Sequence, residues 1–187
     1  MVMNGSRYWG INKVFDHCPL QKKQLRSFSG SIGSIKEDYI EKFTMRGSRL
    51  VNLSFSCRAS LSDASVVHIV KNITSLRTLN IRNCSLLTDI RLHHIAEHAS
   101  NRLKVLHTDI KHPQLSTTEA YIDEFSRKCI QLQHLDINCG DKVLCAGTGM
   151  SSMVCGLPRL HTLVVNNHAT IGRSSRILVA KLRPGLK

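Results

Sequence analysis

Residues 76–84 read LRTLNIRNC, and within them Leu79, Asn80 and Ile81 alternate between apolar and polar. Successive side chains on a β-strand point to opposite faces, so this alternation predicts a strand with one buried and one exposed face. The first six positions, L-x-x-L-x followed by an aliphatic residue or Phe, recur along the chain. Close copies are LVNLSF at 50–55, LQHLDI at 132–137 and LHTLVV at 160–165, and weaker copies are LKVLHT at 103–108 and LRSFSG at 25–30.

The spacing of these copies is regular. They begin at residues 25, 50, 76, 103, 132 and 160, which are 25, 26, 27, 29 and 28 residues apart. A fixed period of about 20–50 residues is the signature of a repeat architecture. The pattern therefore predicts one strand in each of six units.

Helices are predicted between the strands. The stretches LSD at 61–63, LTD at 87–89 and LST at 115–117 each contain a hydroxyl residue that can cap a helix by accepting a bond from a backbone N–H. The pairs Ser34–Glu37 and Ser116–Glu119 also have the spacing of a capping box. Apolar residues then recur at helical spacing. They are Val66, Val67, Ile69, Val70, Leu92, Ile95, Ala96, Ala99, Ala120, Ile122 and Phe125.

A single strand–helix unit of this length cannot bury its own apolar face, so neighbouring units must stack. We therefore predict an α/β solenoid of about six repeats over residues 25–187, with a parallel sheet on the concave side and helices outside. Residues 1–24 are predicted to form an N-terminal cap or an incomplete repeat, in which Tyr8 and Trp9 cover the open apolar end.

The pattern L-x-x-L-x-I-x-x-C at 76–84, followed by LTD at 87–89, resembles the cysteine-containing leucine-rich repeat of F-box/LRR substrate receptors. Cys129 likewise resembles the cysteine that ends a repeat helix in that family. The resemblance implies a leucine-rich repeat solenoid that is not an enzyme and that binds a protein substrate for an SCF-type ubiquitin ligase. Residues 1–24 do not resemble an F-box, so a Skp-type adaptor and a cullin are implied partners only if an F-box is supplied elsewhere.

On the predicted concave sheet, the residues between the inward-pointing apolar positions face outward. The eighteen such positions of the six copies contain one Arg, two Asp and two His, so the face is nearly neutral. Small hydrogen-bonding groups of this kind suit a protein or peptide surface better than a phosphate backbone, although they are also ordinary on a solvated sheet that binds nothing. The predicted partner-binding residues are Asn52, Ser54, Thr78, Asn80, Arg82, Val105, His107, His134, Asp136, Thr162, Val164 and Asn166, with Asn80, Arg82, His107, His134 and Asp136 as the central contacts.

Residues 94–98 read HIAEH, which matches the H-x-x-E-H zinc motif of a class of metalloproteases. The repeat register places this stretch on an outer helix, with both histidines and Glu97 pointing outward. Catalytic zinc needs a third protein ligand, and Glu119 and Glu124 are the downstream glutamates. A zinc hydrolase and an incidental metal site at the two histidines remain alternatives, while the prediction is that the chain has no catalytic residues, no metal and no cofactor.

Seven cysteines are scattered along the chain without a C-x-x-C pair, which favours free thiols over a disulfide framework. Cys84 is predicted to be buried with its thiol capping a turn, and Cys129 and Cys155 are predicted to be buried at helix ends. A metal-binding pair of Cys139 and Cys145 is the alternative.

The 26 Lys and Arg residues outnumber the 13 Asp and Glu residues, giving a formal net charge of +13. Residues 151–187 carry six bases and no acid, and residues 1–50 carry nine bases and four acids. Basic ends attract acidic partners, so nucleic-acid binding is the main alternative function, ahead of the zinc hydrolase, beside the possibility that these ends are simply solvated. The basic residues concerned are Lys22, Lys23, Arg26, Arg173, Arg176, Lys181, Arg183 and Lys187.

No apolar run reaches the roughly 18 residues that a membrane helix needs, and residues 1–25 contain no apolar block followed by small cleavage-site residues. We therefore expect a soluble protein of the cytoplasm or the nucleus that has no membrane partner.

Overall fold

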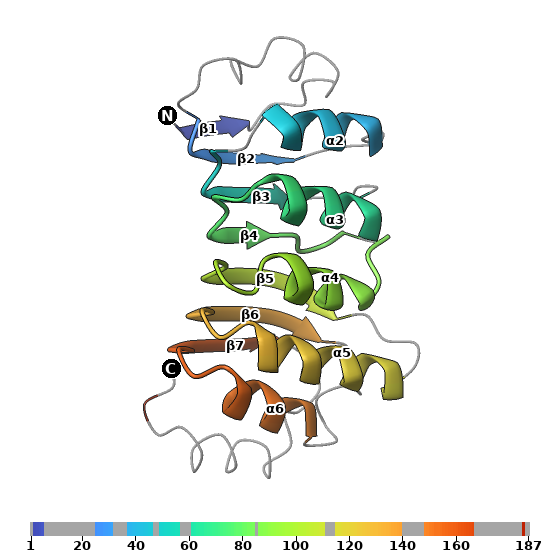
Figure 1. The fold of residues 1–187 in the computed structure, drawn as a ribbon, viewed down its shortest axis with the longest axis vertical. Coiled ribbons are helices and arrows are strands. Elements are labelled where there is room, and N and C mark those ends of the chain that lie inside the picture. Colours follow the sequence, from blue (N-terminus) through green and yellow to red (C-terminus); the bar gives the residue numbers. More distant parts are fainter. Residues whose placement is uncertain are drawn as a thin grey trace.

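The structure is a computed structural model that describes residues 2–5, 25–31, 37–46, 49–56, 61–84, 86–110, 115–139, 148–166 and 185. Seven strands form one parallel sheet, in which each strand pairs with the next one along the chain (Figure 1). The first and last strands form the two edges, so the sheet is open rather than closed into a barrel. The strands are β1 (Val2–Gly5), β2 (Ser27–Ser31), β3 (Asn52–Ser56), β4 (Thr78–Asn80), β5 (Val105–Ile110), β6 (His134–Cys139) and β7 (Thr162–Asn166).

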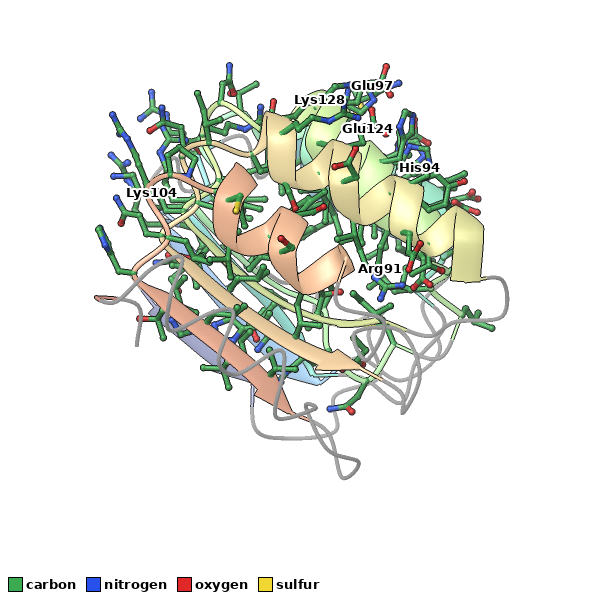
Figure 2. The ribbon with its side chains drawn as sticks, turned by 90° about the horizontal axis from the view of Figure 1, so that it is seen from below. Arg91, His94, Glu97, Lys104, Glu124 and Lys128 are labelled. Atoms are coloured by element: carbon green, nitrogen blue, oxygen red, sulfur yellow. The ribbon has the colours of Figure 1, made fainter. Side chains whose placement is uncertain are left out.

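Helices alternate with these strands from β2 onward and lie together on one face of the sheet (Figure 2). Each of them packs against the helices of the neighbouring units. None of the described helices has the length and the apolar character that crossing a bilayer requires. The helices are α2 (Glu37–Arg46), α3 (Asp63–Asn72), α4 (Ile90–His98), α5 (Leu115–Lys128) and α6 (Thr148–Gly156).

The register of the sheet places equivalent positions of the copies side by side. Leu53 pairs with Leu79, Leu79 with Leu106, Leu106 with Leu135, and Leu135 with Leu163. The first four of these leucines are fully buried beneath the helices, and Leu163 is partly buried on the last strand. The predicted alternation of strand and helix and the predicted parallel sheet are therefore confirmed, and β2 to β7 lie at the six copies of the pattern.

The core lies between the sheet and the helices. The expected helix positions Val66, Ile69, Leu92 and Ile95 are all fully buried there. Each buried side chain of this size contributes about 1.5–3 kcal/mol by leaving water. At the N-terminal end of the core, three aromatic rings fill the same layer in tilted and edge contacts, at centroid distances of 5.2, 6.1 and 6.4 Å. These rings belong to Phe28, Phe43 and Phe55.

One predicted helix cap is confirmed and two are wrong. The Ser62 side chain accepts a bond from the Ser65 backbone N–H, and the Ser65 side chain completes a capping box. Asp89, rather than Thr88, occupies the cap position of α4 and makes no side-chain capping bond. The Thr88 hydroxyl donates to the Asp63 carboxylate of the preceding unit at 2.7 Å. Helix α5 already begins at Leu115, so the following serine lies inside the helix and is not its cap.

Part of the predicted organisation falls outside the described residues. Strand β1 lies within residues 1–24, but Tyr8, Trp9 and the proposed boundary near residue 24 are not among the described residues. The Ser34 cap lies outside them as well. The division into an N-terminal cap and a repeat domain stays a prediction.

Candidate functional site

Four of the predicted central contacts meet on the sheet face opposite the helices, which we call the helix-free face. Arg82 Nη2 lies 2.6 Å from Asp136 Oδ1, and His107 Nδ1 lies 3.0 Å from Asp136 Oδ2. The rings of His107 and His134 lie 5.1 Å apart between centroids. We call Arg82, His107, His134 and Asp136 the polar cluster.

The strand register explains why the polar cluster forms. His107 on β5 pairs directly with Asp136 on β6. His134 stands two residues before Asp136 on the same strand, so both side chains project from the same face. Two imidazoles and one carboxylate from neighbouring strands are thereby gathered at one place on the sheet.

A tight turn after β4 brings Arg82 to the cluster. Asn83 has a positive φ of 60°, a conformation that asparagine tolerates better than most residues, and its N–H donates to Asp109 Oδ2 at 2.5 Å. The Asn80 side chain accepts a bond from the Arg82 N–H, and the Cys84 thiol lies 3.7 Å from the Arg82 carbonyl oxygen. These contacts hold the backbone at Arg82 while its side chain reaches Asp136.

The predicted exposure of the two aspartates on this face is wrong. Asp136 is 8% exposed and Asp109 is 7% exposed, although both are among the eighteen positions predicted to face outward. Arg82 and His107 lie against Asp136, and the turn backbone at Asn83 binds Asp109. Long side chains and a turn from neighbouring units therefore cover carboxylates that strand alternation alone would leave in water.

The surroundings of His134 favour its neutral form. Burial lowers the pKa of His134 below its ordinary value, and the neighbouring His107 lowers it further, whereas Asp136 acts in the opposite direction. A neutral imidazole keeps a lone pair on one ring nitrogen, which can accept a hydrogen bond or bind a metal ion. His134 therefore offers an acceptor at neutral pH.

The remaining predicted contacts are spread along the same face and do not join the polar cluster by any described side-chain contact, apart from the bond between Asn80 and the Arg82 backbone. Asn52 is exposed, and the side chain of Asn166 lies outside the described residues. The half-buried positions are Ser54, Thr78, Asn80, Val105, Thr162 and Val164.

A buried polar network beneath α4 escaped the sequence analysis. Arg91 is 1% exposed, and its Nε donates to the Thr108 hydroxyl at 2.9 Å. Asp89 lies 3.7 Å from the Arg91 guanidinium and accepts a 2.8 Å bond from the Thr118 hydroxyl of α5. Figure 2 shows Arg91 directed between the helices and the sheet. The signal in the sequence was Thr108 at an apolar position of its copy, because a buried hydroxyl there needs a partner.

Burial also governs the charge state of this network. Desolvation lowers the pKa of Arg91, while Asp89, Asp63 and Asp109 oppose that effect. The ordinary pKa of arginine is so high that the guanidinium stays charged at neutral pH. The network therefore joins two units through a buried cation held by polar partners.

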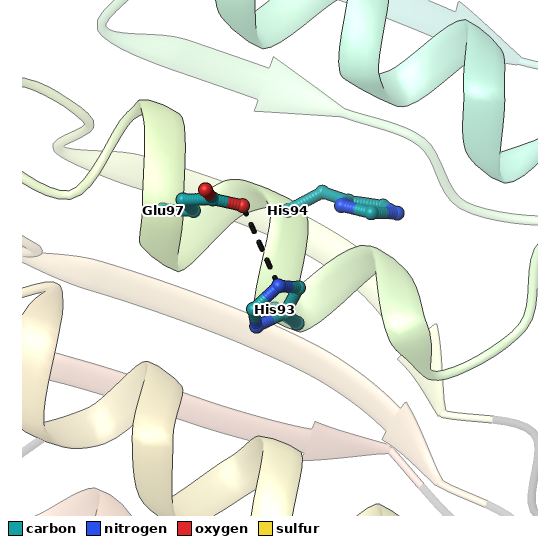
Figure 3. Close-up of side chains that lie close together, drawn as sticks. All are labelled: His93, His94 and Glu97. Carbon is teal, nitrogen blue, oxygen red and sulfur yellow. Dashed lines mark ion pairs between the residues drawn. The ribbon is translucent and has the colours of Figure 1, made fainter.

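The H-x-x-E-H stretch lies on α4, and the side chains of His94 and Glu97 project away from the sheet as predicted (Figure 2). The residue that joins His94 and Glu97 in a potential three-ligand group is His93, and the alternative of an incidental metal site at His94 and His98 stays untested. His93 Nε2 lies 3.4 Å from Glu97 Oε2 (Figure 3), and His93 Nδ1 lies 2.7 Å from a Glu124 oxygen. One helical turn thus brings Glu97 to His93, which lies outside the motif.

Two of the cysteine predictions are confirmed and one is wrong. Cys84 and Cys129 are buried free thiols, as predicted, and the Cys84 thiol contacts the turn carbonyl described above. Cys155 is exposed on α6, so its predicted burial is wrong. The alternative pair of Cys139 and Cys145 lies outside the side chains that the structure describes.

Of the basic residues named for the two ends, the structure describes only Arg26, which is exposed. The other basic residues named for them lie outside the described residues. Compared with known proteins, the chain matches no family model, and no curated protein matches it either.

Proposed function

We propose that this chain is a non-enzymatic protein-binding module of the cysteine-containing leucine-rich repeat type, resembling the substrate-recognition part of an F-box/LRR receptor of an SCF-type ubiquitin ligase. The open parallel sheet with helices on one face supports this proposal. So does the buried Cys84 at the end of the fullest copy of the pattern.

The observation that carries the proposal is the helix-free face itself. It runs across adjacent strands, none of the described helices covers it, and it carries small polar groups from β3 to β7. A protein partner recognised there would meet a broad surface with hydrogen-bonding capacity distributed over several units. Interfaces of this kind gain affinity from shape and from a few well-positioned central contacts.

The polar cluster supplies such central contacts. Arg82 is held by Asp136, so a partner does not have to order a free arginine side chain when it binds. Recognition would proceed by shape and hydrogen bonding, and delivery for ubiquitination would require a Skp-type adaptor and an F-box supplied elsewhere.

The two alternative functions have no specific support among the described residues. The H-x-x-E-H histidines are not gathered into one ligand group, and the basic ends are almost entirely outside the described residues. We therefore propose neither a zinc hydrolase nor a nucleic-acid-binding protein.

Affinity capture from a reducing cell extract at about 0.15 M salt tests the proposal, because charge attraction is screened beyond roughly 8 Å under that condition. The diagnostic variant is Asn52→Arg, which places a bulky side chain on the helix-free face at an exposed position. The matched control is Asn101→Arg, an identical change at an exposed turn after α4. Both variants add one positive charge, so a difference in capture between them comes from the position of the new side chain and not from its charge.

We expect Asn52→Arg to release proteins that the unaltered chain and Asn101→Arg both retain. Equal capture by all three proteins would contradict binding through the helix-free face. Recovery of a Skp-type adaptor or a cullin in the retained set would support the ligase assignment, whereas recovery chiefly of RNA would overturn the proposal in favour of nucleic-acid binding.

A further inference from the structure

Three side chains of the polar cluster form a group that could close around one ion. His107, His134 and Asp136 each offer one ligand atom, and these atoms lie within 4.8 Å of one another. Around a tetrahedral zinc ion with bonds near 2.0 Å, ligand atoms are about 3.3 Å apart. The 3.0 Å separation between His107 Nδ1 and Asp136 Oδ2 is already close to that value. No other separation in the group has to shorten by more than about 1.5 Å to reach it.

From this arrangement we infer that His107, His134 and Asp136 form a binding site for a divalent transition-metal ion of the zinc class on the helix-free face. Two imidazoles and a carboxylate are a ligand set that such ions accept, and a three-residue set leaves a fourth position open. The site does not depend on the proposed protein-binding function, because a metal ion can be tested without a protein partner.

The surroundings of the site favour a preformed ligand set. His107 and Asp136 are paired in the register of β5 and β6, so the sheet backbone holds their spacing. Arg82 contacts Asp136 through Oδ1, while Oδ2 is the oxygen directed at the imidazole. An outer partner that orients a ligating carboxylate is a common feature of metal sites.

The second ligand group, made of His93, His94 and Glu97, is a weaker candidate. All three residues belong to α4, and the Glu97 side chain is 50% exposed. The His93 ring is already engaged by Glu124 at 2.7 Å and by Glu97 at 3.4 Å. These three residues lie on one partly exposed helix and are not held on neighbouring strands by a sheet register, which makes this group a suitable control.

The test is a calorimetric titration of the full chain with Zn²⁺ in a non-chelating buffer with a phosphine reductant, together with two double variants. His107→Gln/His134→Gln removes both imidazoles of the proposed site, and His93→Gln/His94→Gln removes those of α4. We expect the first variant to lose at least about 100-fold in affinity, because loss of an outer-sphere partner alone costs 10–100-fold. The second variant should stay within about twofold of the unaltered chain.

Imidazole NMR signals of the unaltered chain give a second measurement that needs no variant to fold. The first equivalent of Zn²⁺ should shift the ring signals of His107 and His134 together. Three results would overturn the inference: equal affinity of the His107→Gln/His134→Gln variant, a first equivalent that shifts only His93 and His94, or imidazole signals that do not move because cysteine thiolates take the ion.

Discussion

Arg82 and Asp136 stand 54 residues apart in the chain, yet Arg82 Nη2 lies 2.6 Å from Asp136 Oδ1. Arg82 follows β4 and Asp136 belongs to β6, so the contact passes across the intervening strand β5. On that strand His107 contacts the other oxygen of the same carboxylate. One aspartate therefore ties together three consecutive units on the face where a partner is proposed to bind.

We expect the Arg82–Asp136 pair to stabilise the fold measurably, because Asp136 is largely shielded from water. In a double-mutant cycle of Arg82→Ala and Asp136→Ala, the coupling free energy should be about 1 kcal/mol, near the upper end for partly exposed pairs. Urea denaturation of the four proteins measures it. A coupling free energy indistinguishable from zero would show that the pair does not contribute to stability.

The buried Arg91 network should be far more sensitive to truncation. Arg91→Ala removes a fully buried cation and leaves Asp89 and Thr108 without it, so we expect a loss of about 3 kcal/mol in the free energy of unfolding. The matched control is Arg127→Ala, in which the same change affects an ion pair with 69% and 49% exposed side chains. That variant should cost about 0.5 kcal/mol or less. Similar losses in the two variants would contradict a structural role for the buried network.

Thiol reactivity should separate the described cysteines by burial. Burial raises the pKa of Cys129 to about 12, so its thiol stays protonated and shielded at pH 8. Cys155 is exposed and should react with iodoacetamide in the folded protein, whereas Cys84 and Cys129 should react only after unfolding. Peptide mass spectrometry after short labelling identifies the modified residues. Labelling of Cys129 at the rate of Cys155 would show that the helix end opens readily.

The Glu124 contacts predict a pH-dependent contribution to stability. The Lys128 hydrogen bond chiefly lowers the pKa of Glu124 below its ordinary value of 4.5, with a further contribution from His93. A lowered pKa in the folded state means that the stabilisation is present above the unfolded pKa and is lost as the pH falls through the folded value. The advantage of the unaltered chain over Glu124→Gln should therefore hold at pH 6 and fade below pH 4.5.

Lys128→Met provides the control, because it removes the main cause of the lowered pKa while leaving the carboxyl in place. Urea denaturation at a series of pH values measures the free energy of unfolding. For Lys128→Met this free energy should fall less on acidification than it does for the unaltered chain. If the unaltered chain became more stable relative to Glu124→Gln as the pH falls, the proposed role of Glu124 would be contradicted.

The leucine spacing was sufficient to predict the order and the direction of the strands. Leu53, Leu79, Leu106 and Leu135 recur at one position of a pattern with a nearly constant period, and a strand sends alternate side chains to opposite faces. Apolar side chains must leave water, so this local pattern decides which side of each strand meets the helices. The resulting register is the one observed.

The polar contacts between units could not be predicted from the sequence, because only the tertiary structure decides them. Strand alternation places Asp136 outward, but Arg82 from two strands away and His107 from the next strand cover it. The buried Arg91 was not identified from the sequence, and Cys155 was wrongly predicted to be buried. The reason is related, because the burial of a residue depends on which neighbouring unit packs over it. Long polar side chains have many rotamers, and the choice among them is made by charges and hydrogen-bond partners brought together only when the units stack.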